Sequence, residues 1–120
     1  MNGIELIATE RKRQVEIEGW TPEHDSEHEN GELALAAVCY ASPVLLFSKM
    51  DMVEGVSFND PWPSWWDDGW DKRLRDDETE AIIPNSELTS PNRIRNLVKA
   101  GALIASEIDR LLAIEGLEKE

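Results

Sequence analysis

The stretch Ser90–Ile114 constrains the fold more than any other part of the chain, because it reads as one long helix. Ser90 can cap the helix, and Pro91 suits the first helical position. The apolar residues recur at spacings of three and four, which predicts a continuous stripe of Ile94, Leu97, Val98, Gly101, Ile104, Ala105, Ile108, Leu111 and Leu112. We expect the rest of the chain to pack against this stripe.

Small residues mark where a second helix should meet this one. Gly101 lies inside the predicted helix, where glycine costs roughly 1 kcal/mol relative to alanine. Close approach of another backbone or of a ligand would justify that cost. Residues 31–42 predict a second helix that is rich in alanine and apolar nearly all round, which is typical of a buried helix. We expect this helix to lie against residues 100–105 at the centre of the fold.

The first helix is predicted over residues 3–18, with Gly19 as its stop signal. Trp20 should then fold back onto the core. Arg11 and Gln14 fall on the otherwise apolar face of this helix. Either their stems cover its edge while their polar ends reach water, or they line a polar pocket.

Residues 58–77 form the most unusual segment, since four of the five tryptophans, Trp62, Trp65, Trp66 and Trp70, fall within it. Its prolines and glycine exclude a long regular element, so we predict a long loop. Indoles are large apolar groups that must be covered. They either fill the core or form a surface on which a base can stack beside Lys72, Arg73 and Arg75. Within the preceding residues 44–58, the apolar run at 44–47 fits a helix extension or a short strand, and Gly55 with its polar neighbours indicates a loop after it.

Histidines and carboxylates gather in the connection over residues 20–30. His24 and His28 are four residues apart, and Glu32 follows one turn into the next helix, so the three could hold a metal ion. Alternatively, His24 and Asp25 hydrogen-bond the backbone or contact a polar ligand. At the start of the last helix, Arg93, Arg95 and Lys99 either face solvent or meet phosphate at the positive end of the helix dipole.

The length and composition of the chain suit one domain over residues 1–120, with residues 115–120 frayed. We predict a mainly α fold, a compact helical bundle with a long Trp-rich loop. The net charge of −13 argues against direct nucleic-acid binding. It indicates either simple solubility or a surface that imitates DNA or binds a basic partner. No apolar run is long enough to span a membrane, and Cys39 is the single cysteine, so we expect a cytoplasmic protein.

Several segments together resemble a group of small, mostly uncharacterised phage and prophage proteins. The resemblance is carried by the Arg-Gln helix, the stretch Glu-Gly-Trp-Thr-Pro-Glu-His-Asp at 18–25, the Gly-Glu-Leu-Ala helix and Leu-Val-Lys-Ala-Gly-Ala-Leu-Ile at 97–104. It covers more than half of the chain. It implies a phage setting, with the protein acting in the cytoplasm of the infected host cell.

A weaker resemblance is to the ryanodine-receptor repeat domain. It rests on Glu-Gly-Trp-Thr at 18–21, Ile-Pro-Asn-Ser-Glu-Leu at 83–88 and the Arg-led apolar helix from Arg95 to Ile104, and it fails in the middle of the chain. Prokaryotic versions of that domain are thought to bind nucleotide-derived signals. By this analogy, a phage version sequesters an immune signal of its host; likeness of fold alone is a weak reason for function.

We therefore expect binding of a nucleotide-type small molecule without turnover and without a cofactor, in a homo-oligomer. The predicted ligand-binding residues are Arg11, Gln14, Trp20, His24, Asp25, Trp65, Trp66, Arg93 and Lys99. Motifs of phosphate loops and nucleophilic hydrolases are missing from the sequence, which disfavours an enzyme. Two alternatives stay open: an acidic inhibitor of a host defence protein or nuclease, and a metal-dependent nucleotide hydrolase using His24, His28 and Glu32.

Overall fold

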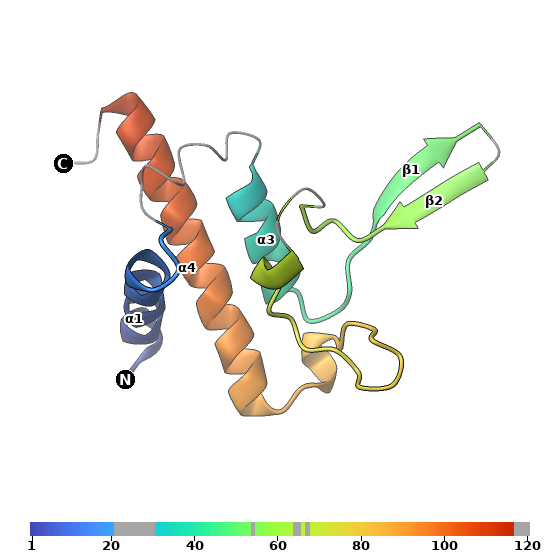
Figure 1. Cartoon of the computed structure of the whole chain (residues 1–120), viewed down its shortest axis with the longest axis horizontal. Helices are drawn as coiled ribbons and strands as arrows, with labels where there is room; N and C mark the ends of the chain where they lie inside the picture. The colour runs from blue at the N-terminus through green and yellow to red at the C-terminus, as the bar shows by residue number, and fades with distance from the viewer. Residues whose placement is uncertain (21–30, 54, 64–65, 67, 117–120) are drawn as a thin grey trace.

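The computed structural model describes residues 1–20, 31–53, 55–63, 66 and 68–116 of the chain. Its helices are α1 (Gly3–Glu16), α3 (Glu32–Ala41) and α4 (Ser90–Glu115), with short 3-10 helices η1 (Asp68–Trp70) and η2 (Asn85–Glu87). The strands are β1 (Ser48–Met52) and β2 (Gly55–Asn59). In Figure 1, α1 and α3 lie on opposite sides of α4, and the β-hairpin projects away from the helices. The prediction of a mainly helical fold is confirmed.

The ends of the helices follow the local sequence closely. Asn2 and Glu5 form a capping box at the start of α1, each side chain accepting a hydrogen bond from the other's backbone N–H. The helix ends at Glu16, two residues before the predicted end, and Gly19 has a left-handed φ of 74°. Trp20 then returns to the core, as expected, and is buried. In α4 the cap is Thr89 rather than Ser90, which is already helical.

The small residues of α3 and α4 do meet at the centre of the fold. Ala36 and Ala37 of α3 and Ala100 of α4 are all at most 3% exposed, and they share the core with Leu33 and Leu103. Their short side chains let the two helices approach closely and exclude water between them. The expectation that α3 is buried all round is wrong, because Ala34 is exposed and so is about half of Val38.

The expectation that the rest of the chain packs on the apolar stripe of α4 is wrong for α3, whereas α1 does contact the stripe, at Gly101. Helix α3 packs instead on a mixed face, whose buried members are Asn96, Ala100, Leu103, Ser106 and Arg110. The polar members are tolerated inside because they have partners: Asn96 donates to Asn85, and the Ser106 hydroxyl donates to the Ala102 carbonyl at 2.9 Å. The predicted stripe remains about half exposed along most of its length.

Helix α1 contacts α4 at Gly101, where the glycine removes the side chain that would block it. A Cβ built on Gly101 would lie 2.6 Å from Cδ1 and 2.8 Å from Cγ1 of Ile7, far inside van der Waals contact. The close approach at Gly101 is therefore made by the side chain of Ile7, whereas the prediction was another backbone or a ligand.

Both alternatives for residues 44–47 are wrong, since these residues form neither a helix extension nor a strand, and the two strands of the β-hairpin lie at 48–52 and 55–59, where a loop was expected. The hairpin is antiparallel, with Ser48 opposite Asn59 and Met52 opposite Gly55. Several apolar side chains at its base and tip are exposed, among them Phe47 and Val53. Within the described part of the chain, none of the helices has both the length and the apolarity to cross a membrane.

Candidate functional site

Five aromatic side chains from distant parts of the sequence form one cluster beside α3 and α4. The aromatic cluster consists of Trp20, Tyr40, Trp62, Trp66 and Trp70. Its rings meet edge to face, with centroids between 5.3 Å (Trp66–Trp70) and 5.9 Å (Trp20–Trp66). This geometry places the positive edge of one ring against the negative face of the next. The indoles therefore bury one another's apolar surface, as the side chains of a hydrophobic core do.

The space left around the aromatic cluster is very small. A cavity of about 10 Å³ lies beside Trp20, Gln14 and Lys99, which is room for one water molecule at most. Trp20 is 7% and Trp66 is 6% exposed. A base could stack on either indole only after that indole separated from its neighbours. In this arrangement the two indoles therefore offer no stacking surface to a base.

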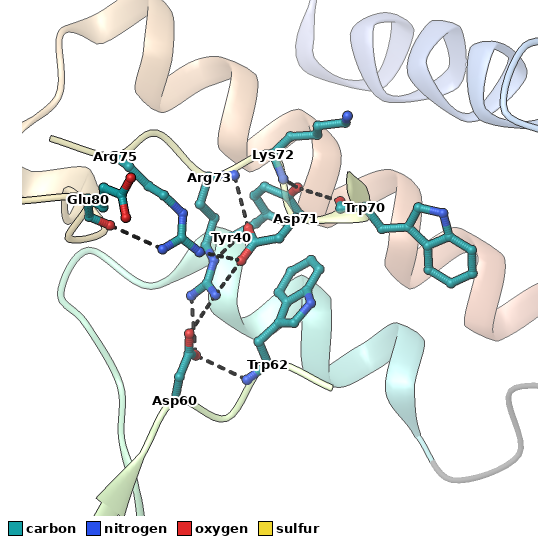
Figure 2. Close-up of polar contacts among 9 residues, drawn as sticks. All are labelled: Tyr40, Asp60, Trp62, Trp70, Asp71, Lys72, Arg73, Arg75 and Glu80. Carbon is teal, nitrogen blue, oxygen red and sulfur yellow. Dashed lines mark hydrogen bonds and ion pairs between the residues drawn. The ribbon is translucent and has the colours of Figure 1, made fainter. Parts of the chain in front are cut away.

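Arg73 closes one side of the aromatic cluster, and Figure 2 shows its guanidinium between two carboxylates. Its Nη2 lies 2.7 Å from Asp60 Oδ2 and 2.8 Å from Asp71 Oδ2, and its Cζ lies 4.9 Å from the centre of the Trp62 ring. Arg75 adds a second cation to Asp71 at 3.3 Å. Arg73 is thus committed to an internal network and does not offer its charge to a phosphate.

Burial and charge act in opposite directions on this network. Burial raises the pKa of Asp60, but hydrogen bonds from Arg73 and from the backbone N–H of Trp62 outweigh it, so the pKa lies below its ordinary value. Burial raises the pKa of Tyr40, whose hydroxyl accepts a 2.7 Å hydrogen bond from the Lys72 backbone N–H. At neutral pH the network therefore holds an ionised Asp60 and a neutral Tyr40.

A groove of about 470 Å³ opens between α1 and the first half of α4. We call it the α1–α4 groove. Four of its side chains are cationic: Arg13, Lys72, Arg95 and Lys99. Its remaining lining consists of two carboxylates and an apolar floor: Glu10, Glu18, Leu6, Pro91, Ile94 and Val98. Its volume falls in the range of small-molecule sites, roughly 300–1,000 Å³.

Glu10 organises the inner wall of the α1–α4 groove. Arg13 contacts both of its oxygens, at 2.7 and 2.9 Å, and Lys99 Nζ lies 3.3 Å from Oε2. Gln14 also donates to Oε2, at 3.2 Å. Burial raises the pKa of Glu10, but the hydrogen bond from Arg13 and the charge of Lys99 more than compensate, so the pKa is lowered. Glu10 is therefore ionised and its charge is balanced.

Lys72 and Arg95 give the groove its excess positive charge. Arg13 and Lys99 are matched by Glu10 and by Glu18, which Arg13 contacts at 3.2 Å. Lys72 and Arg95 are exposed, and neither side chain has an ion-pair partner among the residues whose placement is described. Figure 2 shows the Lys72 side chain extending away from the Arg73 network. Among its described lining residues, the groove thus has two more cations than carboxylates, in a chain of net charge −13.

The structure brings together only some of the predicted ligand-binding residues. Gln14, Trp20 and Lys99 line the same small cavity, and Trp66 contacts Trp20. Arg11 lies on another side of α1, where it donates to the Trp20 carbonyl at 3.0 Å. Arg93 is exposed in the first turn of α4. His24, Asp25 and Trp65 lie outside the described residues.

The suggested metal ligands are not tested as a set, because His24 and His28 also lie outside the described residues. Glu32 is 2% exposed in the first turn of α3. Among the residues that are described, no group of three His, Cys, Asp or Glu side chains could hold a metal ion.

A second, acidic hollow of about 810 Å³ opens beside the Arg73 network. Its lining is Asp60, Trp62, Asp71, Arg75, Asp76, Asp77 and Glu80. The sequence indicated neither this hollow nor the Arg73 network. A local run such as Asp-Lys-Arg-Leu-Arg-Asp-Asp shows that a segment is charged. It does not predict ion pairs between distant residues, such as the one between Arg73 and Asp60, which are thirteen residues apart.

Comparison of the chain with known protein families, with curated proteins and with solved structures found no match.

Proposed function

We propose that the protein binds a nucleotide-derived anion in the α1–α4 groove and releases it unchanged. The observation that carries the proposal is a concave, positively charged surface on a strongly acidic chain. Lys72 and Arg95 would contact phosphate oxygens. The groove also reaches Pro91 in the first turn of α4, where free backbone N–H groups and the helix dipole favour negative charge.

The apolar floor suits the remainder of such a ligand. Leu6, Ile94 and Val98 offer aliphatic contact to a base or ribose. Trp70 and Trp20 lie behind the inner end of the groove, where the small cavity shares Lys72 and Lys99 with it. In this arrangement the indoles support the groove and do not stack on the ligand.

The carboxylates of the groove favour binding over turnover. A general base works best with a pKa near the operating pH. The pKa of Glu10 is lowered instead, because Arg13 and Lys99 stabilise its ionised form. Glu18 is held by Arg13 at 3.2 Å. Given the resemblance to phage proteins, we take a nucleotide signal of host defence as the ligand and sequestration as the purpose.

The test is isothermal titration calorimetry of the purified protein with ADP-ribose, cyclic di-GMP and ATP. We expect at least one to bind, and Lys72→Ala and Arg95→Ala each to weaken binding roughly 10- to 100-fold, the value of a charge-assisted hydrogen bond. Lys12→Ala is the matched control, because Lys12 is exposed on α1 outside the groove. This variant should bind the nucleotide as tightly as the wild type.

After binding, the protein is denatured by heat and the released nucleotide is identified by mass spectrometry. Recovery of the intact nucleotide supports sequestration, whereas a hydrolysis product contradicts it. The proposal is also contradicted if none of the three binds at millimolar concentration, or if Lys12→Ala weakens binding as much as Lys72→Ala.

A second candidate function is binding of a basic protein partner, and the acidic hollow favours it. Five carboxylates line that hollow against one guanidinium, that of Arg75. A basic peptide such as oligolysine should then bind with an affinity that falls steeply with salt. Replacing Asp76 and Asp77 by asparagine should remove most of that binding and leave any nucleotide binding unchanged.

A further inference from the structure

Gln14 presents a buried hydrogen-bond acceptor without a donor among the described residues. The residue is 3% exposed, and its side-chain oxygen, Oε1, accepts no hydrogen bond within the part of the chain that the structure describes. Nearly all buried polar groups in proteins are hydrogen-bonded, so an exception requires an explanation. A bound molecule that donates a hydrogen bond to Oε1 supplies one.

The orientation of the Gln14 amide is fixed by Glu10. The amide nitrogen, Nε2, donates to Glu10 Oε2 at 3.2 Å. The same carboxylate accepts hydrogen bonds from Arg13 and Lys99, which stabilise its ionised form. An ionised carboxylate can only accept, so a reversed amide would place two acceptors against each other. The nitrogen therefore belongs beside Glu10, and Oε1 is the acceptor left for a ligand.

Gln14 lies where the α1–α4 groove meets the small cavity behind it. The cavity of about 10 Å³ is lined by Gln14 and shares Glu18, Lys72 and Lys99 with the groove. A space of this size holds one group no larger than a water molecule. The exocyclic amino group of a nucleotide base is of about that size and donates hydrogen bonds. A base that lies in the groove can therefore extend such a group toward Gln14.

Lys99 supplies a donor beside this acceptor. Its Nζ lies 3.3 Å from Glu10 Oε2, the same oxygen that accepts from Gln14 Nε2. An ammonium group has three N–H donors, and the contact with Glu10 occupies one of them. The inner end of the groove thus pairs an amide oxygen with a cationic donor. Adenine has the complementary edge, since its amine lies next to an unprotonated ring nitrogen, N7.

We propose that the inner end of the α1–α4 groove selects adenine. Gln14 Oε1 accepts a hydrogen bond from the exocyclic amine, and Lys99 Nζ donates to the neighbouring ring nitrogen. Hypoxanthine carries a carbonyl oxygen in place of the amine, so it would set a second acceptor against Gln14 Oε1 and is rejected. This inference rests on the proposed function, nucleotide binding in the same groove, and adds the identity of the base.

The first test compares ATP with ITP by isothermal titration calorimetry, because ITP differs in having the carbonyl oxygen of hypoxanthine in place of the amine. We expect ATP to bind the wild type roughly 10-fold more tightly, the value of one such hydrogen bond. Gln14→Met keeps the length of the side chain and removes the acceptor, so the preference for ATP should disappear. Lys12→Met is the matched control, because Lys12 is exposed on α1 outside the groove. This variant should keep the preference.

Nuclear magnetic resonance of the wild-type chain tests the contact without a substitution. Gln14 is the single glutamine of the sequence, so glutamine labelled with ¹⁵N in the side chain gives a single side-chain amide signal. We expect saturating ATP to shift this signal clearly, and ITP to shift it much less at equal occupancy of the groove.

The outcomes separate the choice of base from nucleotide binding itself. The selection of adenine is overturned if ATP and ITP bind equally tightly, if Gln14→Met keeps the preference of the wild type, or if bound ATP leaves the Gln14 signal unmoved. Each of these results leaves nucleotide binding in the groove intact. If no nucleotide binds at millimolar concentration, the proposed function and the selection of adenine are both overturned.

Discussion

The side-chain amide of Asn96 donates a hydrogen bond to the side-chain oxygen of Asn85 at 2.7 Å, inside the protein. The amide nitrogen of Asn85 in turn donates to the backbone carbonyls of Tyr40, at 2.6 Å, and Ser42, at 2.8 Å. The pair therefore joins the end of α3 to η2 and α4. Buried amides are costly unless they are hydrogen-bonded, so this pair determines how the three segments meet.

Removing either amide should destabilise the fold. Asn85→Ala and Asn96→Ala each leave buried polar groups without partners, and we expect each to lower the free energy of unfolding by roughly 1–3 kcal/mol. Urea unfolding followed by tryptophan fluorescence measures this. Ser86→Ala, at an exposed neighbouring position, is the control and should change stability by less than about 0.5 kcal/mol. Equal effects at positions 85 and 86 would contradict the role of the pair.

Gly101 and Ile7 should be energetically coupled. In isolation, Gly101→Ala raises helix propensity by up to about 1 kcal/mol. In the wild type, however, the new methyl group would lie within 2.6 Å of Ile7 Cδ1, so α1 must shift and we expect a net loss of stability. In an Ile7→Ala background the same change should become neutral or stabilising. A double-mutant cycle measures the difference, and additive effects would show that α1 does not contact α4 here.

The buried guanidinium of Arg73 should contribute far more to the stability of the fold than the exposed guanidinium of Arg75. Arg73→Met removes the cation from between Asp60 and Asp71, and breaking a buried pair in this way costs roughly 3–5 kcal/mol. Arg75→Met removes one exposed pair and should cost at most about 1 kcal/mol. Urea unfolding of the two variants provides the comparison, and similar losses would contradict the described network.

Asp60 should contribute to acid sensitivity. Its pKa in the folded protein lies below its ordinary value, since Arg73 and the Trp62 N–H outweigh the effect of burial. Such a group adds stability above the unfolded pKa, roughly 3.9, and loses that contribution as the pH falls through the folded pKa. Asp60→Asn should therefore be less stable than the wild type at pH 6, with a smaller difference at pH 3. A difference that does not change with pH would be inconsistent with this pairing.

Cys39 should react slowly with thiol reagents in the folded protein. Burial raises the pKa of its thiol to about 11, so very little thiolate is present at pH 8. Compared with a free cysteine of pKa roughly 8.5, we expect modification by a disulfide reagent to be slower on the order of 100-fold. In urea the rate should return to that of a model peptide. Fast labelling of the folded chain would indicate that α3 is more open than described.

Helices were predictable from this sequence, whereas their orientation was not. The start and period of α1, α3 and α4 depend on nearby residues: the Asn2–Glu5 box, Pro91 and the alanine-rich run. The face that α4 buries depends on distant ones. Asn96 and Ser106 can be internal because Asn85 and the Ala102 carbonyl are their partners. Hydrophobic periodicity cannot detect such partners, and it therefore selected the exposed stripe.

For the candidate site, the sequence indicated the types of residue but not their grouping. The sequence grouped Arg95 and Lys99 with Arg93 as the basic start of α4. It grouped Lys72 with the tryptophans instead, and only the fold brings Lys72 into the α1–α4 groove beside Arg95 and Lys99. Lys72 reaches the groove because Tyr40 fixes its backbone N–H, thirty-two residues away along the chain. Arg73, its neighbour, is oriented the other way by Asp60 and Asp71. Lys72 and Arg73 are thus adjacent in the sequence but lie in different sites. Contacts with distant residues cause this difference, and no local sequence pattern predicts it.

The hairpin that projects in Figure 1 has a consequence for the cooperativity of the whole chain. A two-stranded ribbon with little hydrophobic backing is only marginally stable on its own. We therefore expect β1 and β2 to open and close while the helices stay closed, so that their amides exchange with deuterium well before those of α4. The free energy of local opening would then be lower for the hairpin than for α4, and the protein would unfold in steps.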